Sequence, residues 1–244
     1  MRVAALYDIH GNLPALEAVL QEVRQAAVDT IVVGGDVVIG PMPRETVTCL
    51  LELNLPVQFI YGNAEVAVLD QMAGKNPAAV PEQYLPIVRW TAQELRPEDQ
   101  RLLASWPKTI RLDIQGIGDV LFCHGTPRDD NEIFTRLTPE ERLLPVFQGL
   151  HVVVCGHTHM QFDRMIGMTR VVNAGSVGAP FGEPGADWLL LGPEVEFRHT
   201  MYDLREAAER IRATNYPEDF AARYVLATPS AAEMLEMFTA ASLR

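Results

Sequence analysis

Residues 3–12 read Val-Ala-Ala-Leu-Tyr-Asp-Ile-His-Gly-Asn, and this stretch decides the fold class. The apolar run from Val3 to Tyr7 predicts a short buried strand. A loop carrying Asp8 and His10 follows it, and Asn12 is suited to cap the next helix, in which apolar residues recur at helical spacing. A buried strand that feeds a polar loop and then a helix is how an α/β fold begins.

The same order repeats twice further along the chain. Thr30–Val33 predicts a second buried strand and Val57–Tyr61 predicts a third strand, with a helix predicted between them over Arg44–Leu53. The two strands stop at Gly-Gly-Asp36 and at Gly-Asn63. Strands alternating with helices predict parallel pairing. In such sheets ligands bind beyond the carboxyl ends of the strands, where these polar residues lie.

The rest of the chain does not continue this alternation of strands and helices. Residues 64–106 predict helices broken by a loop at 74–81. The second half predicts strands at Thr109–Ile114, Asp119–Cys123, His151–Cys155, Arg170–Asn173, Asp187–Leu191 and Val195–Thr200. From Asp203 the sequence predicts helices again. We therefore expect one domain over residues 1–244, with a core over about 1–200 and a helical extension over about 203–244.

Composition excludes several classes of protein. The 244 residues carry a net charge of −12, which disfavours long nucleic acids and anionic membranes as partners. No apolar run approaches the roughly 20 residues of a membrane span, and the first residues leave no room for a signal peptide, so the cytoplasm is the expected location. Three scattered cysteines are too few for a disulfide framework or a zinc knuckle.

Chemistry-bearing residues gather in five short segments at predicted strand ends. Four of the six histidines fall in these segments. Asp8 and His10 are two residues apart, as are His157 and His159, so each pair can face one side of an extended segment. The five segments are Asp8-Ile9-His10-Gly11-Asn12, Gly35-Asp36, Gly62-Asn63, Cys123-His124-Gly125-Thr126-Pro127 and Gly156-His157-Thr158-His159.

This ligand set suits two metal ions better than one. Two carboxylates, four imidazoles and one amide oxygen exceed what a single tetrahedral ion needs. With a bridging hydroxide, the formal charge of such a site is about +1, which favours phosphate. Mixed nitrogen and oxygen ligands favour Mn, Fe, Zn, Co or Ni over Mg or Ca.

At these residues the sequence resembles the calcineurin-like metallophosphoesterase superfamily, whose motifs are D-x-H, G-D, G-N-H-D/E, a His-Gly segment and G-H-x-H. The order and spacing match from Asp8 to His159. Asn173–Gly178 and Gly35–Pro41 further resemble a small prokaryotic branch of predicted phosphodiesterases, the YfcE-like and diadenosine-tetraphosphatase-related proteins.

The resemblance implies a four-layer αββα sandwich of two mixed sheets flanked by helices. It assigns Asp8, His10 and His159 to a first metal, and Asn63, His124 and His157 to a second, with Asp36 as the bridge. It gives catalytic roles to Asp36, Asn63 and His124.

The function implied is hydrolysis of a small phosphoester, in first place a phosphodiester, by direct attack of a metal-bridging hydroxide on phosphorus. The expected cofactors are two divalent transition-metal ions, with Mn²⁺ as first choice. The alternative is a non-catalytic metal-binding or scaffold protein on the same fold.

One departure from the family and three further residues leave alternatives open. The third motif has Ala64 where many members have the His thought to protonate the leaving group, although Glu65, which would steady that His, is retained. Asn12 is a candidate for orienting a metal-bound group or for capping its helix. Arg128 is a candidate for a substrate phosphate or an ordinary surface charge, and Phe181 for a wall of the substrate pocket or a surface loop.

Overall fold

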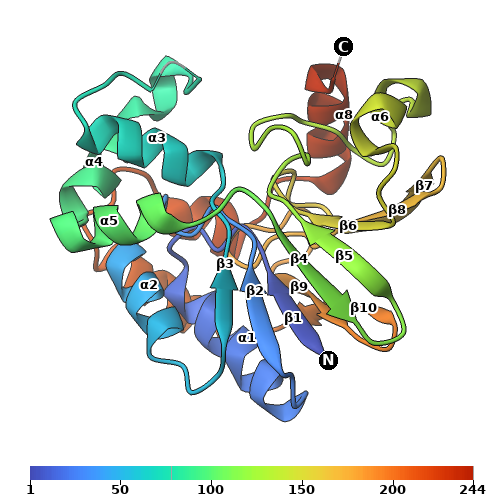
Figure 1. Ribbon diagram of the computed structural model, residues 1–244. Coiled ribbons are helices and arrows are strands. Elements are labelled where there is room, and N and C mark those ends of the chain that lie inside the picture. The colour runs from blue at the N-terminus through green and yellow to red at the C-terminus, as the bar shows by residue number, and fades with distance from the viewer. Residues whose placement is uncertain (78, 244) are drawn as a thin grey trace.

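Two five-stranded sheets pack face to face, with helices on their outer sides (Figure 1). This computed structural model describes residues 1–77 and 79–243. The first sheet has the order β10–β9–β1–β2–β3, formed by Val195–Thr200, Ala186–Leu191, Val3–Leu6, Thr30–Val33 and Val57–Phe59. The second has the order β4–β5–β6–β8–β7, formed by Ile110–Ile114, Gly118–Phe122, Val152–Cys155, Thr169–Asn173 and Phe162–Ile166.

Most predicted elements are confirmed, and the αββα sandwich is confirmed with them. The predicted loop at 74–81 separates helices as expected, although its residue 78 lies outside the described residues. The main helices are α1 (Leu13–Gln25), α2 (Pro43–Leu51), α3 (Asn63–Met72), α4 (Leu85–Glu94), α5 (Pro97–Ser105), α6 (Glu140–Phe147), α7 (Leu204–Arg212) and α8 (Ala231–Ala241).

Two elements were not predicted from the sequence. Strand β7 lies at the edge of its sheet and reads Phe-Asp-Arg-Met-Ile, with both ends buried and exposed or half-buried residues between them. Helix α6 has eight residues and contains Pro145. A short polar edge strand and a short helix with an internal proline carry weak periodic signals, because tertiary contacts rather than local propensity hold them.

Strand β1 shows how one segment serves two cores. Val3, Ala5 and Tyr7 are fully buried in the core between the two sheets. Ala4 and Leu6 are fully buried in the core between the first sheet and its helices. Side chains alternate along a strand, so a sheet covered on both faces requires an unbroken apolar run, as β1 has.

Parallel pairing brings distant polar residues to one edge of each sheet. Strand β1 pairs in parallel with β2, and β2 with β3, so the segments that follow them meet at the carboxyl ends of the strands. In the second sheet β5 and β6 are also parallel. The segments that directly follow β1, β2, β3, β5 and β6 carry the predicted metal ligands, and the two sheets bring these segments together.

The C-terminal helices run across several parts of the molecule. Arg210 of α7 makes an ion pair with Glu17 of α1 at 2.6 Å. Tyr216 then packs edge-on against Trp90 of α4, with ring centroids 5.1 Å apart. Helix α8 ends beside α6 on the opposite side of the molecule (Figure 1). Within 1–77 and 79–243, no helix has both the length and the apolar character that crossing a bilayer demands.

Candidate metal centre

The structure gathers six of the seven predicted ligands into two groups of three. Asp8, His10 and His159 form one group, and Asp36, His124 and His157 form the other. Within each group the candidate ligand atoms all lie within 4.8 Å of one another. The first group has the three side chains that the family resemblance assigned to the first metal, and the second has His124 and His157 together with Asp36, the expected bridge.

Asp36 lies between the two groups. Its Oδ1 is 3.3 Å from His124 Nε2, and its Oδ2 is 3.9 Å from His10 Nε2. Asn63, the seventh predicted ligand, has its Oδ1 3.1 Å from His124 Nε2. The Asp36 carboxylate therefore faces both groups, as a bridging ligand must; Asp8 Oδ1 also lies 3.8 Å from His124 Nε2, and the amide oxygen of Asn63 lies beside the second group.

Backbone carbonyls orient three of the four imidazoles. The Nδ1 atoms of His10, His124 and His159 lie 3.0, 2.8 and 2.8 Å from the carbonyl oxygens of Ile39, Gly34 and Ala179. A carbonyl can only accept a hydrogen bond, so each Nδ1 carries the proton and each Nε2 is left toward the centre. Such outer contacts fix the tautomer and the ring orientation of metal-binding histidines.

Backbone strain concentrates at the same residues. Among the described residues, six other than glycine have positive φ, and five of them are Asp8, His10, Asp36, His157 and His159. This conformation is uncommon outside glycine and persists where surrounding structure enforces it. The backbone is closely packed at His10, where a Cβ on Gly40 would lie 1.6 Å from the carbonyl oxygen of His10.

Charge coupling perturbs every titrating group in the centre. Burial lowers the pKa of His124, but the charges of Asp36 and Asp8 raise it more, to about 10. Burial and then the charge of His124 lower the pKa of His157 to about 4. Burial alone would raise the pKa of Asp36, yet the charge of His124 holds it well below its usual range. Without metal, the centre thus holds ionised carboxylates against a protonated His124.

Two buried polar atoms without a hydrogen-bond partner make this centre suitable for binding cations. Among the described residues, Asp8 Oδ1 and His157 Nε2 are buried and make no hydrogen bond. Asp8 uses its other oxygen to accept from the backbone N–H of His157 at 2.9 Å. Leaving a buried carboxylate oxygen unpaired costs free energy. Divalent ions held by these atoms would satisfy them, and the mixed nitrogen and oxygen donors suit transition metals.

Glu65 ties the second and third motifs together. Its buried carboxylate accepts hydrogen bonds from the backbone N–H groups of Asp36, Val37 and Gly62 at 2.8 Å and of Val38 at 3.3 Å. Burial and then the charge of Asp36 raise its pKa to about 7, against the lowering effect of backbone donors. The retained Glu therefore has a role in this chain that needs no His at position 64.

The position of the absent His is buried. Ala64 is 2% exposed, and its backbone N–H donates to Asp36 Oδ1 at 2.8 Å. Its place in the first turn of α3 thus helps to hold the bridging carboxylate.

Asn12 and Arg128 each have protein partners. Asn12 is fully buried; its Oδ1 accepts from the Ala15 N–H at 3.2 Å, which caps α1, and its Nδ2 donates to the Gly178 carbonyl at 2.8 Å. The exposed Arg128 forms a pair with Glu132, in which the guanidinium donates to both carboxylate oxygens at 2.6–2.9 Å.

Two residues at the end of β8 and just after it bond to the backbone of the ligand-bearing segments, a role that the sequence left undefined. Ser176 Oγ donates to the backbone carbonyl of Asp8 at 2.7 Å, and Asn173 Nδ2 donates to that of Gly156 at 2.6 Å. The family resemblance of Asn173–Gly178 was the sequence signal for these contacts, since they join segments far apart in the chain.

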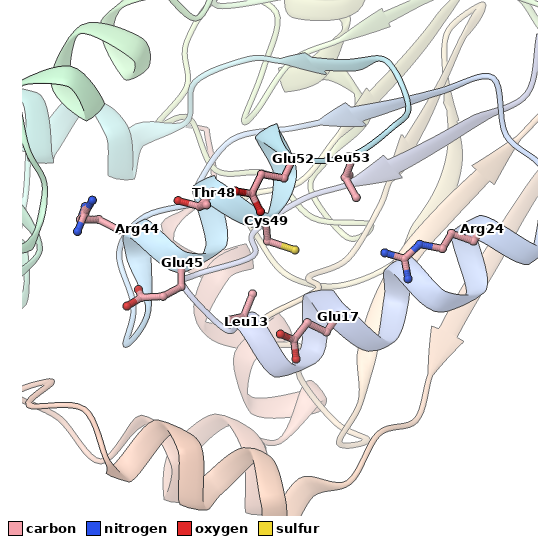
Figure 2. Close-up of a pocket in the computed structure, with 9 residues that line it drawn as sticks. All are labelled: Leu13, Glu17, Arg24, Arg44, Glu45, Thr48, Cys49, Glu52 and Leu53. Carbon is pink, nitrogen blue, oxygen red and sulfur yellow. The ribbon is translucent and has the colours of Figure 1, made fainter.

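A cavity of about 530 Å³ lies elsewhere, between α1 and α2 (Figure 2). Its lining includes Glu17, Glu45 and Glu52 together with Arg24 and Arg44, and none of the seven ligands. Opposite charges along an open groove give it no concentrated field for an anion. The ligand groups at the strand ends are therefore a better candidate for the functional site than this groove.

The geometry and the sequence lead to one class of protein. The Calcineurin-like phosphoesterase superfamily domain matches residues 1–192. The chain belongs to this superfamily and is a phosphoesterase by class. Phosphodiesterase YfcE of Escherichia coli strain K12 is 28% identical over 204 residues, covering 80% of this chain and 89% of that protein.

Two solved structures extend the comparison over nearly the whole chain. A metallophosphoesterase from Sphaerobacter thermophilus has a TM-score of 0.70 at 26% identity, covering 91% of this chain and 97% of that one. The hypothetical protein PH1004 from Pyrococcus horikoshii OT3 has a TM-score of 0.79 at 20% identity, covering 93% and 99%. The second likeness concerns the fold alone.

Proposed function

We propose that this protein is a phosphodiesterase that hydrolyses a small phosphoester with two divalent transition-metal ions, manganese first among them. The single observation that carries the proposal is the pair of three-residue ligand groups with the Asp36 carboxylate between them. When bound, two such ions polarise the phosphoryl oxygens and lower the pKa of a shared water, which supplies the nucleophile.

The chain's own residues hold the ions and prepare the site for an anion. Asp8, His10 and His159 would hold one ion, and Asn63, His124 and His157 the other, with Asp36 shared. Only two of these side chains are formally negative, so the loaded centre is cationic although the chain carries −12. This local charge favours a phosphate over a neutral ester.

Burial keeps water away from one side of the centre. Asp8, Asp36 and His124 are at most 4% exposed, whereas His10, His157, His159 and Asn63 are half-buried. The half-buried ligands mark the side from which a substrate can approach. The buried ones keep their charges in a medium of low dielectric, where charge interactions are stronger than in water.

Two considerations favour diesters with good leaving groups. Ala64 provides no proton donor for the departing oxygen, and general acid help commonly contributes 10²–10⁴-fold. Esters of acidic alcohols need that help least. The similarity to a protein named phosphodiesterase YfcE points the same way.

The test is hydrolysis of bis(p-nitrophenyl) phosphate beside p-nitrophenyl phosphate. Metal-stripped protein receives Mn²⁺, and Asp36→Ala is compared with Asp119→Ala, a control whose carboxylate is about half exposed and paired with Arg111. We expect Mn²⁺-dependent turnover that favours the diester, is lost in Asp36→Ala and persists in Asp119→Ala. No turnover by folded protein with any divalent metal would favour the non-catalytic alternative.

A further inference from the structure

One loop, residues 178–185, contacts the His159 ring at two points, whereas the Nε2 atom faces His10 and Asp8. The Nδ1 atom of His159 donates to the Ala179 carbonyl at 2.8 Å. The ring of Phe181 stacks on the imidazole, with centroids 5.1 Å apart and planes inclined by 20°. One hydrogen bond and one stacked face together fix where Nε2 points.

The C-terminal segment holds this loop in turn. The Gly182 N–H donates to the Pro229 carbonyl at 2.9 Å, and the Thr228 hydroxyl donates to the Gly182 carbonyl. The ring of Phe238, from α8, stacks on Phe181 with centroids 6.0 Å apart and planes inclined by 27°. Three aromatic rings thus form a continuous series from α8 to a metal ligand.

Helix α8 is also anchored at its far end. Thr239 and Thr135 share a hydrogen bond between hydroxyls at 2.7 Å, and the Leu243 N–H donates to the Ile133 carbonyl at 3.0 Å. Residues 133–135 follow the segment that carries His124. The helix is therefore held at both ends and can act as a rigid support for Phe181.

The other ligands are held within the segment that matches the superfamily domain. His10 and His124 bond to the carbonyls of Ile39 and Gly34, and Asp36 accepts from the Ala64 N–H. All of these partners lie in residues 1–192, whereas Phe238 lies outside them. The support of the two ligand groups is thus unequal.

We propose that α8, acting through Phe238 and Phe181, positions His159 and so sets the metal affinity of the Asp8–His10–His159 group selectively. This inference rests on the proposed function, since it requires that the centre bind metal. Phe181 and Phe238 are positioning residues, because they act on the ion through the His159 ring, on which Phe181 stacks. Loss of an outer contact commonly weakens metal binding by 10- to 100-fold.

The experiment is calorimetric titration of metal-stripped protein with Mn²⁺. A His159→Ala variant identifies which binding step belongs to its group. We expect Phe238→Ala to weaken that step by about tenfold and to leave the other unchanged. Phe238→Tyr, which keeps a ring, should bind as the wild type does. Met237→Ala is the matched control, because its side chain is on the same helix and 52% exposed.

A shortened chain ending at Ala227 provides a second variant, which removes the whole of α8. It should weaken the same step at least as much as Phe238→Ala does. Circular dichroism shows whether each variant keeps its fold. Equal weakening of both steps, or wild-type affinity in a folded Phe238→Ala, would overturn the inference. Failure of the wild type to bind Mn²⁺ would overturn the proposed function itself, and this inference with it.

Discussion

Replacement of Asn12 separates its structural role from a direct role in catalysis. Its Oδ1 caps α1 through the Ala15 N–H, and its Nδ2 bonds to the Gly178 carbonyl, with both groups buried. Loss of an N-cap costs about 1 kcal/mol. Leaving a buried carbonyl without its donor costs about 1–3 kcal/mol. Asn12→Ala should therefore lower the free energy of unfolding by about 2–4 kcal/mol.

A serine at this position divides that loss into its two parts. Serine is also a strong N-cap, but it is too short to replace the amide donor to Gly178. Asn12→Ser should therefore retain about 1 kcal/mol of what Asn12→Ala loses. Ser230 offers a control, since it caps α8 at the surface, where its Oγ accepts from the Glu233 N–H at 3.4 Å. Ser230→Ala should cost no more than about 1 kcal/mol.

Urea unfolding of metal-stripped protein measures these differences, and diester turnover with Mn²⁺ is measured beside it. At this chain length, 1 kcal/mol corresponds to about 2–4 °C in Tm, so Asn12→Ala is also visible by thermal melting. If Asn12→Ser unfolds like the wild type and yet loses more than about a hundredfold in kcat, the structural reasoning is refuted. Asn12 would then act on a metal-bound group.

Three further predictions concern protons, the Glu65 anchor and the absent acid. The pKa of His124 is raised to about 10 in the metal-free protein, so Mn²⁺ must displace its proton, and metal binding should release protons and tighten from pH 6 to pH 8. Calorimetry in buffers of different ionisation enthalpy measures the proton release. A metal affinity that does not change with pH would contradict this prediction. Glu65→Ala removes the acceptor of four buried N–H groups and should lower the free energy of unfolding at pH 8 by more than about 4 kcal/mol. Glu45 is exposed at the same position of α2, so Glu45→Ala should lower the free energy of unfolding by less than about 1 kcal/mol. Ala64→His should raise turnover of alkyl esters more than that of aryl esters, in a variant shown by melting to be folded; an unchanged ratio of the two rates would mean that a missing acid is not what limits the enzyme.

The sequence predicted that the ligands lie at the carboxyl ends of the parallel strands, because local sequence patterns mark where each strand ends. Each strand before Asp8, Asp36 and Asn63 is mainly apolar, and a glycine or an aspartate follows it directly. Parallel strands align their ends, so these residues had to share one edge. The assignment of ligands to two groups came from the family resemblance, and the structure brings together the first of these groups and, for the second, His124 and His157 with Asp36.

The long-range support of the centre was not accessible in the same way. The Phe181 contact with Phe238 joins positions 57 residues apart, and nothing in either local sequence marks it. The sequence predicted helices after Asp203 but gave no partner for them, because an amphipathic face indicates burial without indicating against what. Similarly, the four donors to Glu65 come from two loops that meet only after the strands have paired.

The sequence by itself thus determined which side chains are the candidate metal ligands and at which edge of the sheets they lie, because apolar periodicity and strand-ending residues are local properties. Only the tertiary structure decided what orients those side chains: the carbonyls behind three imidazoles, the strained backbone of five ligands and the aromatic series from α8 to His159. Those features depend on packing between segments that are distant in the chain, and packing is fixed only when the whole molecule folds.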